Sequence, residues 1–183
     1  MTDLKNIVVI IALAFAIVLV SCSSSSVLDE TPTASPTANV DLRLVPPTAE
    51  VVSPNSFVLT IEVEPNSSDV TGVQARLSFD PTRLQVTTVS IDPESPLNFS
   101  LEALGDNELG EITIAAGLLT SSPPVEAFTL GSVTFEVLPV EMVTTTAVSF
   151  ITEGKRQTIA SIDGEDITGK VMGSTITIQP SGP

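Results

Sequence analysis

The chain has no histidine, tryptophan or tyrosine among its 183 residues, and Cys22 is its only cysteine. The lack of histidine excludes histidine-based general-base catalysis and histidine metal ligands. Without Trp and Tyr, the sequence also lacks the aromatic platforms that most sugar-binding sites use. A single cysteine allows no disulfide within the chain. An exported domain of this sequence must therefore be held together by its apolar core.

Basic residues are scarce as well. The sequence contains seven Lys and Arg residues and 22 Asp and Glu residues, which gives a formal net charge of −15. Such a charge repels nucleic acid and anionic lipid head groups, so we expect neither as a partner. The sequence has no Gly-x-Ser-x-Gly motif, phosphate-binding loop or metal-ligand spacing. Its acids lie mostly in predicted turns or beside Thr and Ser on strands, unlike the paired carboxylates of glycosidases. We therefore expect no enzymatic activity.

The N-terminus has the layout of a bacterial lipoprotein signal. Lys5 precedes an apolar run at 7–20, which ends in Leu19-Val20-Ser21-Cys22, a sequence that looks like a lipobox. The run is short for a membrane-spanning helix, which needs about 20 apolar residues. We expect a signal peptide at 1–21, lipidation of Cys22, and an exported protein anchored by lipid to the bacterial membrane or cell surface. An uncleaved signal anchor, or an ordinary signal peptide with an incidental cysteine, is the alternative.

Composition and periodicity divide the remaining chain in two. Residues 22–39 are rich in Ser, Thr and Pro and are expected to form an extended tether. From residue 40 onward, apolar and polar residues alternate with a period of two, which predicts strands. These are expected at 40–44, 57–63, 73–79, 84–91, 112–118, 131–138, 144–151, 157–162 and 174–178, with a possible short piece at 167–171. Only residues 100–109 suggest a helical turn. About nine short strands in one domain, residues 40–179, predict an all-β sandwich.

The segment 73–91, VQARLSFDPTRLQVTTVSI, resembles the third and fourth strands of a cohesin domain. The resemblance rests on the Phe79-Asp80-Pro81 turn followed by Leu84. It also rests on the order of the later pieces. These are EITIAAGL at 111–118, LGSVTFEV at 130–137, an Asp-Gly hairpin at 163–164 and a closing strand at 174–178. It covers almost all of residues 40–179 and implies a nine-stranded antiparallel jelly roll, a fold related to carbohydrate-binding modules. It further implies a receptor for dockerin modules, which dock polysaccharide-degrading or other extracellular proteins. Calcium is then expected on the dockerin partner, with no cofactor or metal on this chain.

The resemblance and the strand pattern together suggest a partner-binding face. In cohesins an Asn and an Asp on the third strand often contact the dockerin, and the matching positions here are Gly72 and Gln74. Gln74, Arg76 and Ser78 are expected on the exposed side of that strand, so we take Gly72, Gln74, Arg76 and Ser78 as candidate partner-binding residues. Arginine is enriched at interface hot spots. Alternatively, Arg76 is a solvated strand residue paired with a nearby acid.

Three acidic segments have structural explanations. Asp80 is expected to cap its turn through the carboxylate, and Pro81 to fix the backbone there. The segments 163–166, DGED, and 106–108, DNE, offer clustered oxygens that Ca²⁺ could use. However, the first does not match an EF-hand loop, and Asp-Gly is a favoured hairpin turn.

Two other functions remain open. A carbohydrate-binding module on the same fold would need a planar row of exposed aromatic rings. Four phenylalanines are expected to face inward, at positions 57, 79, 135 and 150. Phe99 and Phe128 would therefore have to lie side by side. The second alternative is a non-specific Ig-like structural spacer of the cell envelope, which would have no ligand-specific face.

Overall fold

The computed structural model describes residues 40–119 and 122–182, and all regular structure in this part of the chain is β-strand. The expected signal peptide, Cys22 and the tether lie outside the described residues. Across the described ranges, no helix is long and apolar enough to span a membrane. The strands are β1 (Val40–Val45), β2 (Thr48–Val52), β3 (Ser56–Glu64), β4 (Gly72–Ser78), β5 (Leu84–Ile91), β6 (Phe99–Asp106), β7 (Glu111–Gly117), β8 (Phe128–Val137), β9 (Thr144–Phe150), β10 (Ile159–Ile162), β11 (Glu165–Asp166), β12 (Thr168–Met172) and β13 (Ser174–Gln179).

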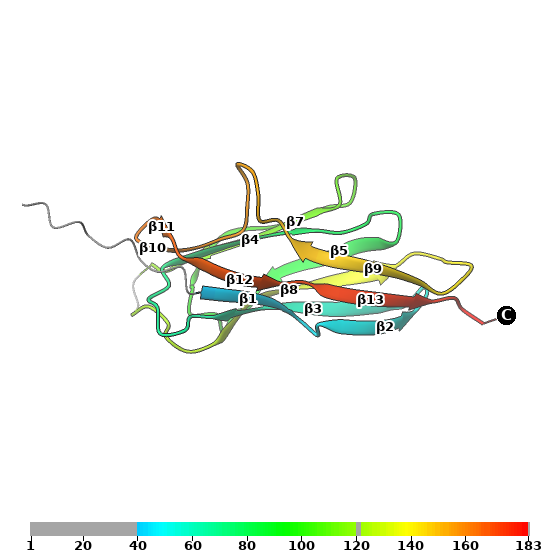
Figure 1. Ribbon diagram of the computed structural model, residues 1–183, viewed down its shortest axis with the longest axis horizontal. Helices are drawn as coiled ribbons and strands as arrows, with labels where there is room; N and C mark the ends of the chain where they lie inside the picture. Colours follow the sequence, from blue (N-terminus) through cyan, green and yellow to red (C-terminus); the bar gives the residue numbers. More distant parts are fainter. Residues whose placement is uncertain (1–39, 120–121, 183) are drawn as a thin grey trace, which may run out of the picture. The chain divides into compact units, whose positions relative to one another are not determined.

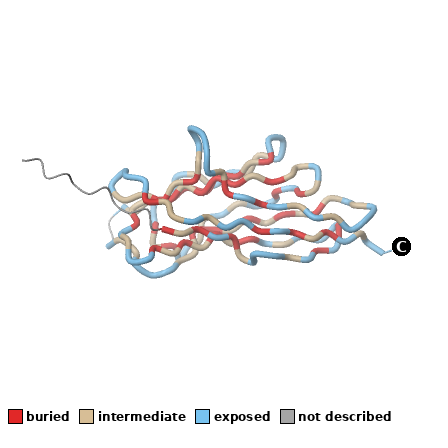
Figure 2. The backbone as a smooth tube through the Cα atoms, in the orientation of Figure 1, coloured by how far each residue is buried: buried red, intermediate tan, exposed pale blue. Residues whose placement is uncertain are grey.

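These strands form two sheets that pack face to face (Figure 1). The first sheet has the order β12-β1-β3-β8-β5. The second is eight-stranded and runs β11-β10-β4-β9-β13-β2, with β7 beside β4 and β6 beside β7. In β4 the inward side chains of Val73, Ala75 and Leu77 are 3%, 0% and 0% exposed, as alternation on a sheet with one buried face requires. Figure 2 shows the same alternation of buried and less buried positions along other strands.

One edge of the sandwich is formed by strands that pass from one sheet to the other. β1 lies in the five-stranded sheet and β2 in the eight-stranded sheet, with Pro46 and Pro47 between them. Proline lacks the N–H that a sheet ladder needs, so the ladder stops there. β12 and β13 cross in the same way at Gly173, where a Cβ would lie 2.5 Å from the carbonyl oxygen of Val148. Both pairings at this edge, β1 with β12 and β2 with β13, are parallel.

The predicted β-sandwich is confirmed, with two corrections to its elements. Residues 100–109 do not form a helical turn, because residues 99–106 are strand β6, which pairs antiparallel with β7. At Gly105 a Cβ would lie 2.7 Å from a methyl group of Val86, so only glycine lets β6 approach β5 this closely. The second correction is β2, which the sequence pattern did not predict. The expected arrangement of about nine antiparallel strands is corrected too: the described residues form thirteen strands, and the sheets are mixed because the two crossing pairs are parallel.

Candidate partner-binding face

The four residues predicted to bind a partner lie on one face of β4. This strand is central in its sheet, with β7 along one side and β9 and β10 along the other. Gly72, Gln74, Arg76 and Ser78 alternate with the buried core residues of β4, so they belong to the side turned away from the core. We call this side of the eight-stranded sheet the outward face.

Small side chains form the floor at one end of the outward face. Gly72 pairs with Gly117 of β7, and Gln74 pairs with Ala115. Because directly opposed residues share a face of the sheet, these four lie together. They line a shallow hollow of about 350 Å³, which Leu101 of β6 and Ile159 and Ser161 of β10 also line.

Large apolar side chains are exposed beside this floor, on strand β6. Phe99, Leu101 and Leu104 are 45%, 62% and 60% exposed, and Leu109 in the following turn is 71% exposed. β6 pairs with β7 alone and is an edge of its sheet. Exposed apolar groups gathered along one edge are typical of interaction surfaces. Because a helical turn was expected here, this apolar edge was not predicted from the sequence. The alternation of Phe99 and Leu101 with Ser100 and Glu102 is the sequence signal that could have indicated a strand.

Arg76 is buried, and the expectation that its side chain is exposed is wrong. The residue is 5% exposed, and its Nη2 lies 2.6 Å from Oε2 of Glu111 on β7. Its Nε is buried and has no hydrogen-bond partner in the structure. The expected pairing with a nearby acid is present, but at the floor of the face and not in solvent. A second, smaller hollow of about 90 Å³ lies here, lined by Arg76, Glu102, Leu104, Asp106, Leu109, Glu111, Thr113 and Arg156.

Gln74 and Ser78 are half-buried and bond to neighbouring backbone. Nε2 of Gln74 donates to the carbonyl oxygen of Gln157 at 2.9 Å. The hydroxyl of Ser78 donates weakly to the carbonyl oxygen of Ser149 at 3.5 Å. These bonds fix the two side chains against the loops and strands beside β4. The Gln74 bond restrains that side chain before a partner binds, which lowers the entropic cost of binding one there.

Asp80 and Pro81 form the turn after β4. One carboxylate oxygen of Asp80 accepts from the Thr82 backbone N–H at 2.9 Å and from the Thr82 hydroxyl at 2.6 Å. These two bonds, with a smaller contribution from the nearby charge of Arg83, lower the pKa of the Asp80 carboxyl below its usual value of 3.8. The role of this residue in the structure is to hold the turn.

The acidic segments at 163–166 and 106–108 belong to the hairpins β10–β11 and β6–β7. Asp163 and Gly164 have positive φ angles of 50° and 89° and connect β10 to β11. Asp106 accepts from the backbone N–H groups of Glu108 and Leu109, and the Asn107 amide bonds the backbone of β5. In the described residues no three acidic, Cys or His side chains are grouped to hold a metal ion.

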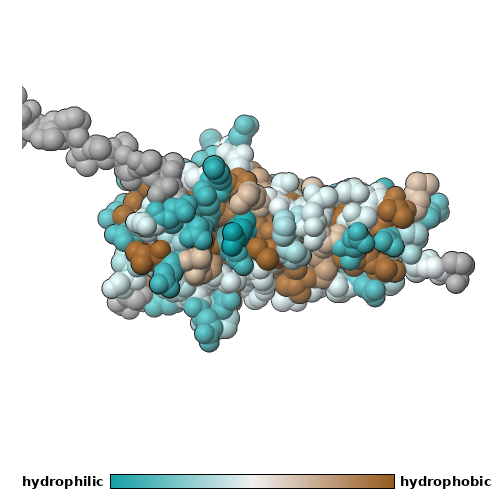
Figure 3. All heavy atoms as spheres, turned by 60° about the horizontal axis from the view of Figure 1, so that its bottom comes forward, coloured by the Kyte–Doolittle hydropathy of each residue, from teal (hydrophilic) through white to brown (hydrophobic). Residues whose placement is uncertain are grey.

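Apolar side chains are also exposed on other sides of the sandwich, among them Val58 and Met172. Figure 3 turns the β2 and β3 side forward and shows separate apolar groups between polar ones. A hollow of about 430 Å³ lies near the crossing edge, lined by Arg43, Leu44, Val45, Pro47, Glu62 and Met172. The Arg43–Glu62 ion pair, 2.6 Å long, lies in its lining. None of the predicted partner-binding residues is found there.

The phenylalanines do not form an aromatic row. Phe99 belongs to β6 of the eight-stranded sheet and Phe128 to β8 of the other sheet. Two ring contacts occur among the described residues, and both involve Phe135, which contacts Phe57 and Phe79. Phe99 and Phe128 are therefore not stacked side by side, which removes the arrangement that a sugar-binding platform would require.

The comparisons with known proteins bear on the fold of this sandwich. No protein-family model matches the sequence, and no curated protein matches it. Solved structures do match the fold. A cohesin from Clostridium acetobutylicum is 16% identical, with a TM-score of 0.64 over 80% of this chain and 95% of its own. A chain of a type I cohesin–dockerin complex from Clostridium thermocellum is 12% identical, with a TM-score of 0.63 over 80% and 97%.

A third similar structure comes from an archaeon. A non-cellulosomal cohesin from the archaeon Archaeoglobus fulgidus is 17% identical, with a TM-score of 0.55 over 77% of this chain and 91% of its own. At these identities the comparisons show the fold: a cohesin-type jelly-roll sandwich, as the sequence resemblance predicted.

Proposed function

We propose that this protein is an exported, lipid-anchored docking module that binds a protein partner of the dockerin type through its outward face. The observation that carries the proposal is the exposed apolar edge, Leu101 and Leu104, beside a floor of small residues on a fold shared with cohesins. One structure of this fold was solved as a cohesin–dockerin complex. A face of this kind provides apolar contact area, which a protein interface needs at its centre.

The proposed role is non-catalytic. The protein would hold another extracellular protein, such as a polysaccharide-degrading enzyme, at the cell surface. Calcium would be required by the partner and not by this chain. Lys and Arg on the partner would meet the acidic surface of this protein, whose net charge is −15, and speed association. Sugar binding by the protein itself has less support, because Phe99 and Phe128 lie on different sheets.

Titration calorimetry tests the binding function. The purified protein is titrated with a panel of calcium-loaded dockerin modules, including the dockerin of the Clostridium thermocellum complex, and again with chelator present. Saturable binding that chelation abolishes supports the proposal. If no module binds in either condition, the structural-spacer function is favoured instead.

Anchoring is tested separately, through Cys22. The proposal expects the native protein to fractionate with membranes and to carry a lipid-modified N-terminal cysteine, detected by mass spectrometry. Cys22→Ser should leave the protein unlipidated. A Cys22→Ser protein that remains membrane-bound to the same extent would contradict lipid anchoring and favour an uncleaved signal anchor.

A further inference from the structure

The outward face carries a loop that interrupts one of its strands. β9 and β10 lie along the same side of β4: β9 pairs with Leu77 and Ser78, and β10 pairs with residues 72–74. Between them the chain leaves the sheet at 151–158, opposite Arg76. Figure 1 shows this loop, in orange, standing out from the sheet near β4 and β7. We call residues 151–158 the β9–β10 loop.

Hydrogen bonds hold the base of the β9–β10 loop closed. The Thr158 backbone N–H donates to the carbonyl oxygen of Ile151 at 2.7 Å. The Thr158 hydroxyl accepts from the Arg76 backbone N–H at 3.1 Å and donates to the Arg76 carbonyl oxygen at 3.0 Å. Thr158 is 3% exposed, so these bonds are shielded from water. The loop therefore leaves the sheet at a fixed point, in the middle of the outward face.

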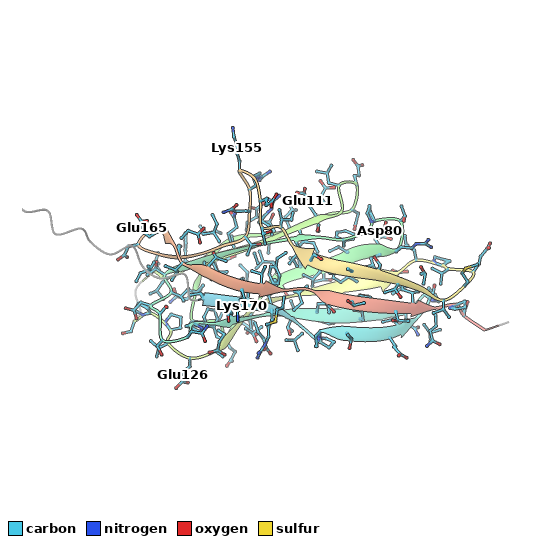
Figure 4. All side chains as sticks on the ribbon, viewed as in Figure 1. Asp80, Glu111, Glu126, Lys155, Glu165 and Lys170 are labelled. Carbon is cyan, nitrogen blue, oxygen red and sulfur yellow. The ribbon has the colours of Figure 1, made fainter. Side chains whose placement is uncertain are left out.

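The tip of the loop carries basic side chains on an otherwise acidic protein. Lys155 and Arg156 are exposed, and they are two of the six Lys and Arg in the described residues. Both ion pairs found in the described part of the chain, Arg43–Glu62 and Arg76–Glu111, leave these two side chains out. Figure 4 shows Lys155 at the loop tip, above the region of Glu111.

Arg156 connects the loop to the outward face. It lines the smaller hollow together with Leu104 and Leu109, whose side chains are 60% and 71% exposed. Three carboxylate residues line this hollow as well, Glu102, Asp106 and Glu111. A polyanion such as phosphate or an acidic polysaccharide would be repelled by these carboxylates. A single partner carboxylate would instead contact Lys155 and Arg156 at the exposed loop tip, and only an apolar group would lie near the three carboxylates, against Leu104 and Leu109.

We infer that the β9–β10 loop selects the partner, an inference that rests on the proposed function. It does so by binding a protein segment that carries an Asp or Glu beside an apolar side chain. The carboxylate lies against Lys155 and Arg156, and the apolar group covers Leu104 and Leu109. The loop contributes specificity and association rate, while the apolar edge and the small-residue floor provide most of the contact area.

The test uses a displayed random-peptide library as the probe. Peptides are selected on the purified protein and counter-selected on its Leu104→Asp variant, so that those retained need the apolar side of the hollow beside the loop. Each retained peptide is then measured on Lys155→Glu and on Lys170→Glu, which makes the same charge change at an exposed residue of β12. Inorganic phosphate and polygalacturonate are titrated in parallel.

We expect the retained peptides to be enriched in Asp and Glu, to lose about tenfold in affinity on Lys155→Glu, and to change by less than about twofold on Lys170→Glu. Retained peptides without acidic residues, or with equal losses on both variants, would overturn the inference while leaving the docking face intact. No retained peptide at all would overturn the docking face and the inference with it. Binding of phosphate or polygalacturonate that Lys155→Glu abolishes would assign the loop to a non-protein anion and also overturn it.

Discussion

The buried hydroxyl of Thr158 should contribute about 2 kcal/mol to the unfolding free energy. Thr158→Val removes this hydroxyl, so the variant should be less stable by that amount. Valine fills nearly the same space but cannot accept the hydrogen bond from the Arg76 backbone N–H, 3.1 Å away. A buried donor left without an acceptor costs about 1–3 kcal/mol. The Arg76 carbonyl oxygen suffers less, because it still accepts from the Ile151 N–H at 2.8 Å. One orphaned donor therefore dominates the loss.

Thr158→Ser is the matched control, because it keeps the hydroxyl and removes only a buried methyl group. Burial of one methyl-sized group is worth about 0.8 kcal/mol, so the serine variant should lose about half as much stability as the valine variant. Urea unfolding followed by far-UV circular dichroism is the appropriate assay, since the chain has no Trp or Tyr for fluorescence. The midpoint should fall with the slope unchanged. A valine variant as stable as the serine variant would refute the role assigned to the hydroxyl.

Three further predictions concern other parts of the sandwich. Glu111→Ala should lower the unfolding free energy by about 1–2 kcal/mol, because Arg76 is left buried without its carboxylate. The loss is smaller than for a fully buried ion pair because the Glu111 side chain is 39% exposed. The same urea assay should show recovery in the Glu111→Ala/Arg76→Met double variant; no recovery would contradict this explanation. Gly131→Ala should cost about 1–3 kcal/mol by the same assay, because its Cβ would lie 2.4 Å from a backbone oxygen of β5. Gly117→Ala, whose nearest atom is 3.7 Å away, should change stability by less than about 0.5 kcal/mol, and equal losses would contradict the steric argument. Because the folded-state pKa of the Asp80 carboxyl is lowered, its stabilising contribution should be complete above about pH 4 and lost as pH falls through the folded pKa. Urea titrations across this range should show the stability difference from Asp80→Asn shrinking on acidification; a difference that stays constant or grows would contradict the sign.

Local patterns in the sequence predicted the parts of the fold that depend on neighbouring residues. The alternation in 73–79 places Val73, Ala75 and Leu77 in the core, where they are almost fully buried. The Asp163-Gly164 pair predicted a hairpin, and both residues have the positive φ angles that such a turn requires. Each of these features is determined within a few residues, so one sequence is enough to predict it.

Features that depend on distant residues were missed or misassigned. Alternation correctly puts Arg76 on the outward side of β4, but its burial depends on Glu111, 35 residues away, and on the β9–β10 loop packed beside it. Residues 100–109 have leucine spacing that also suits a helical turn, and the pairing of β6 with β7 overrides it. The predicted partner-binding residues therefore share one face of β4, as alternation indicated, but the prediction did not include the exposed apolar residues of β6. That edge becomes visible only once β6 is placed beside β7.

The central claim, that this protein docks a protein partner on its outward face, is tested most directly by placing one charge on each side of the sandwich. Leu101→Asp puts a carboxylate at the apolar edge, where the native side chain is 62% exposed. Val58→Asp does the same on β3 of the other sheet, where the native side chain is 49% exposed. Both variants are titrated with any dockerin module that the native protein binds. The account predicts that Leu101→Asp weakens binding by about tenfold or more and that Val58→Asp leaves it within about twofold. Loss of binding in Val58→Asp with full binding in Leu101→Asp, or no dockerin bound by the native protein, would contradict it.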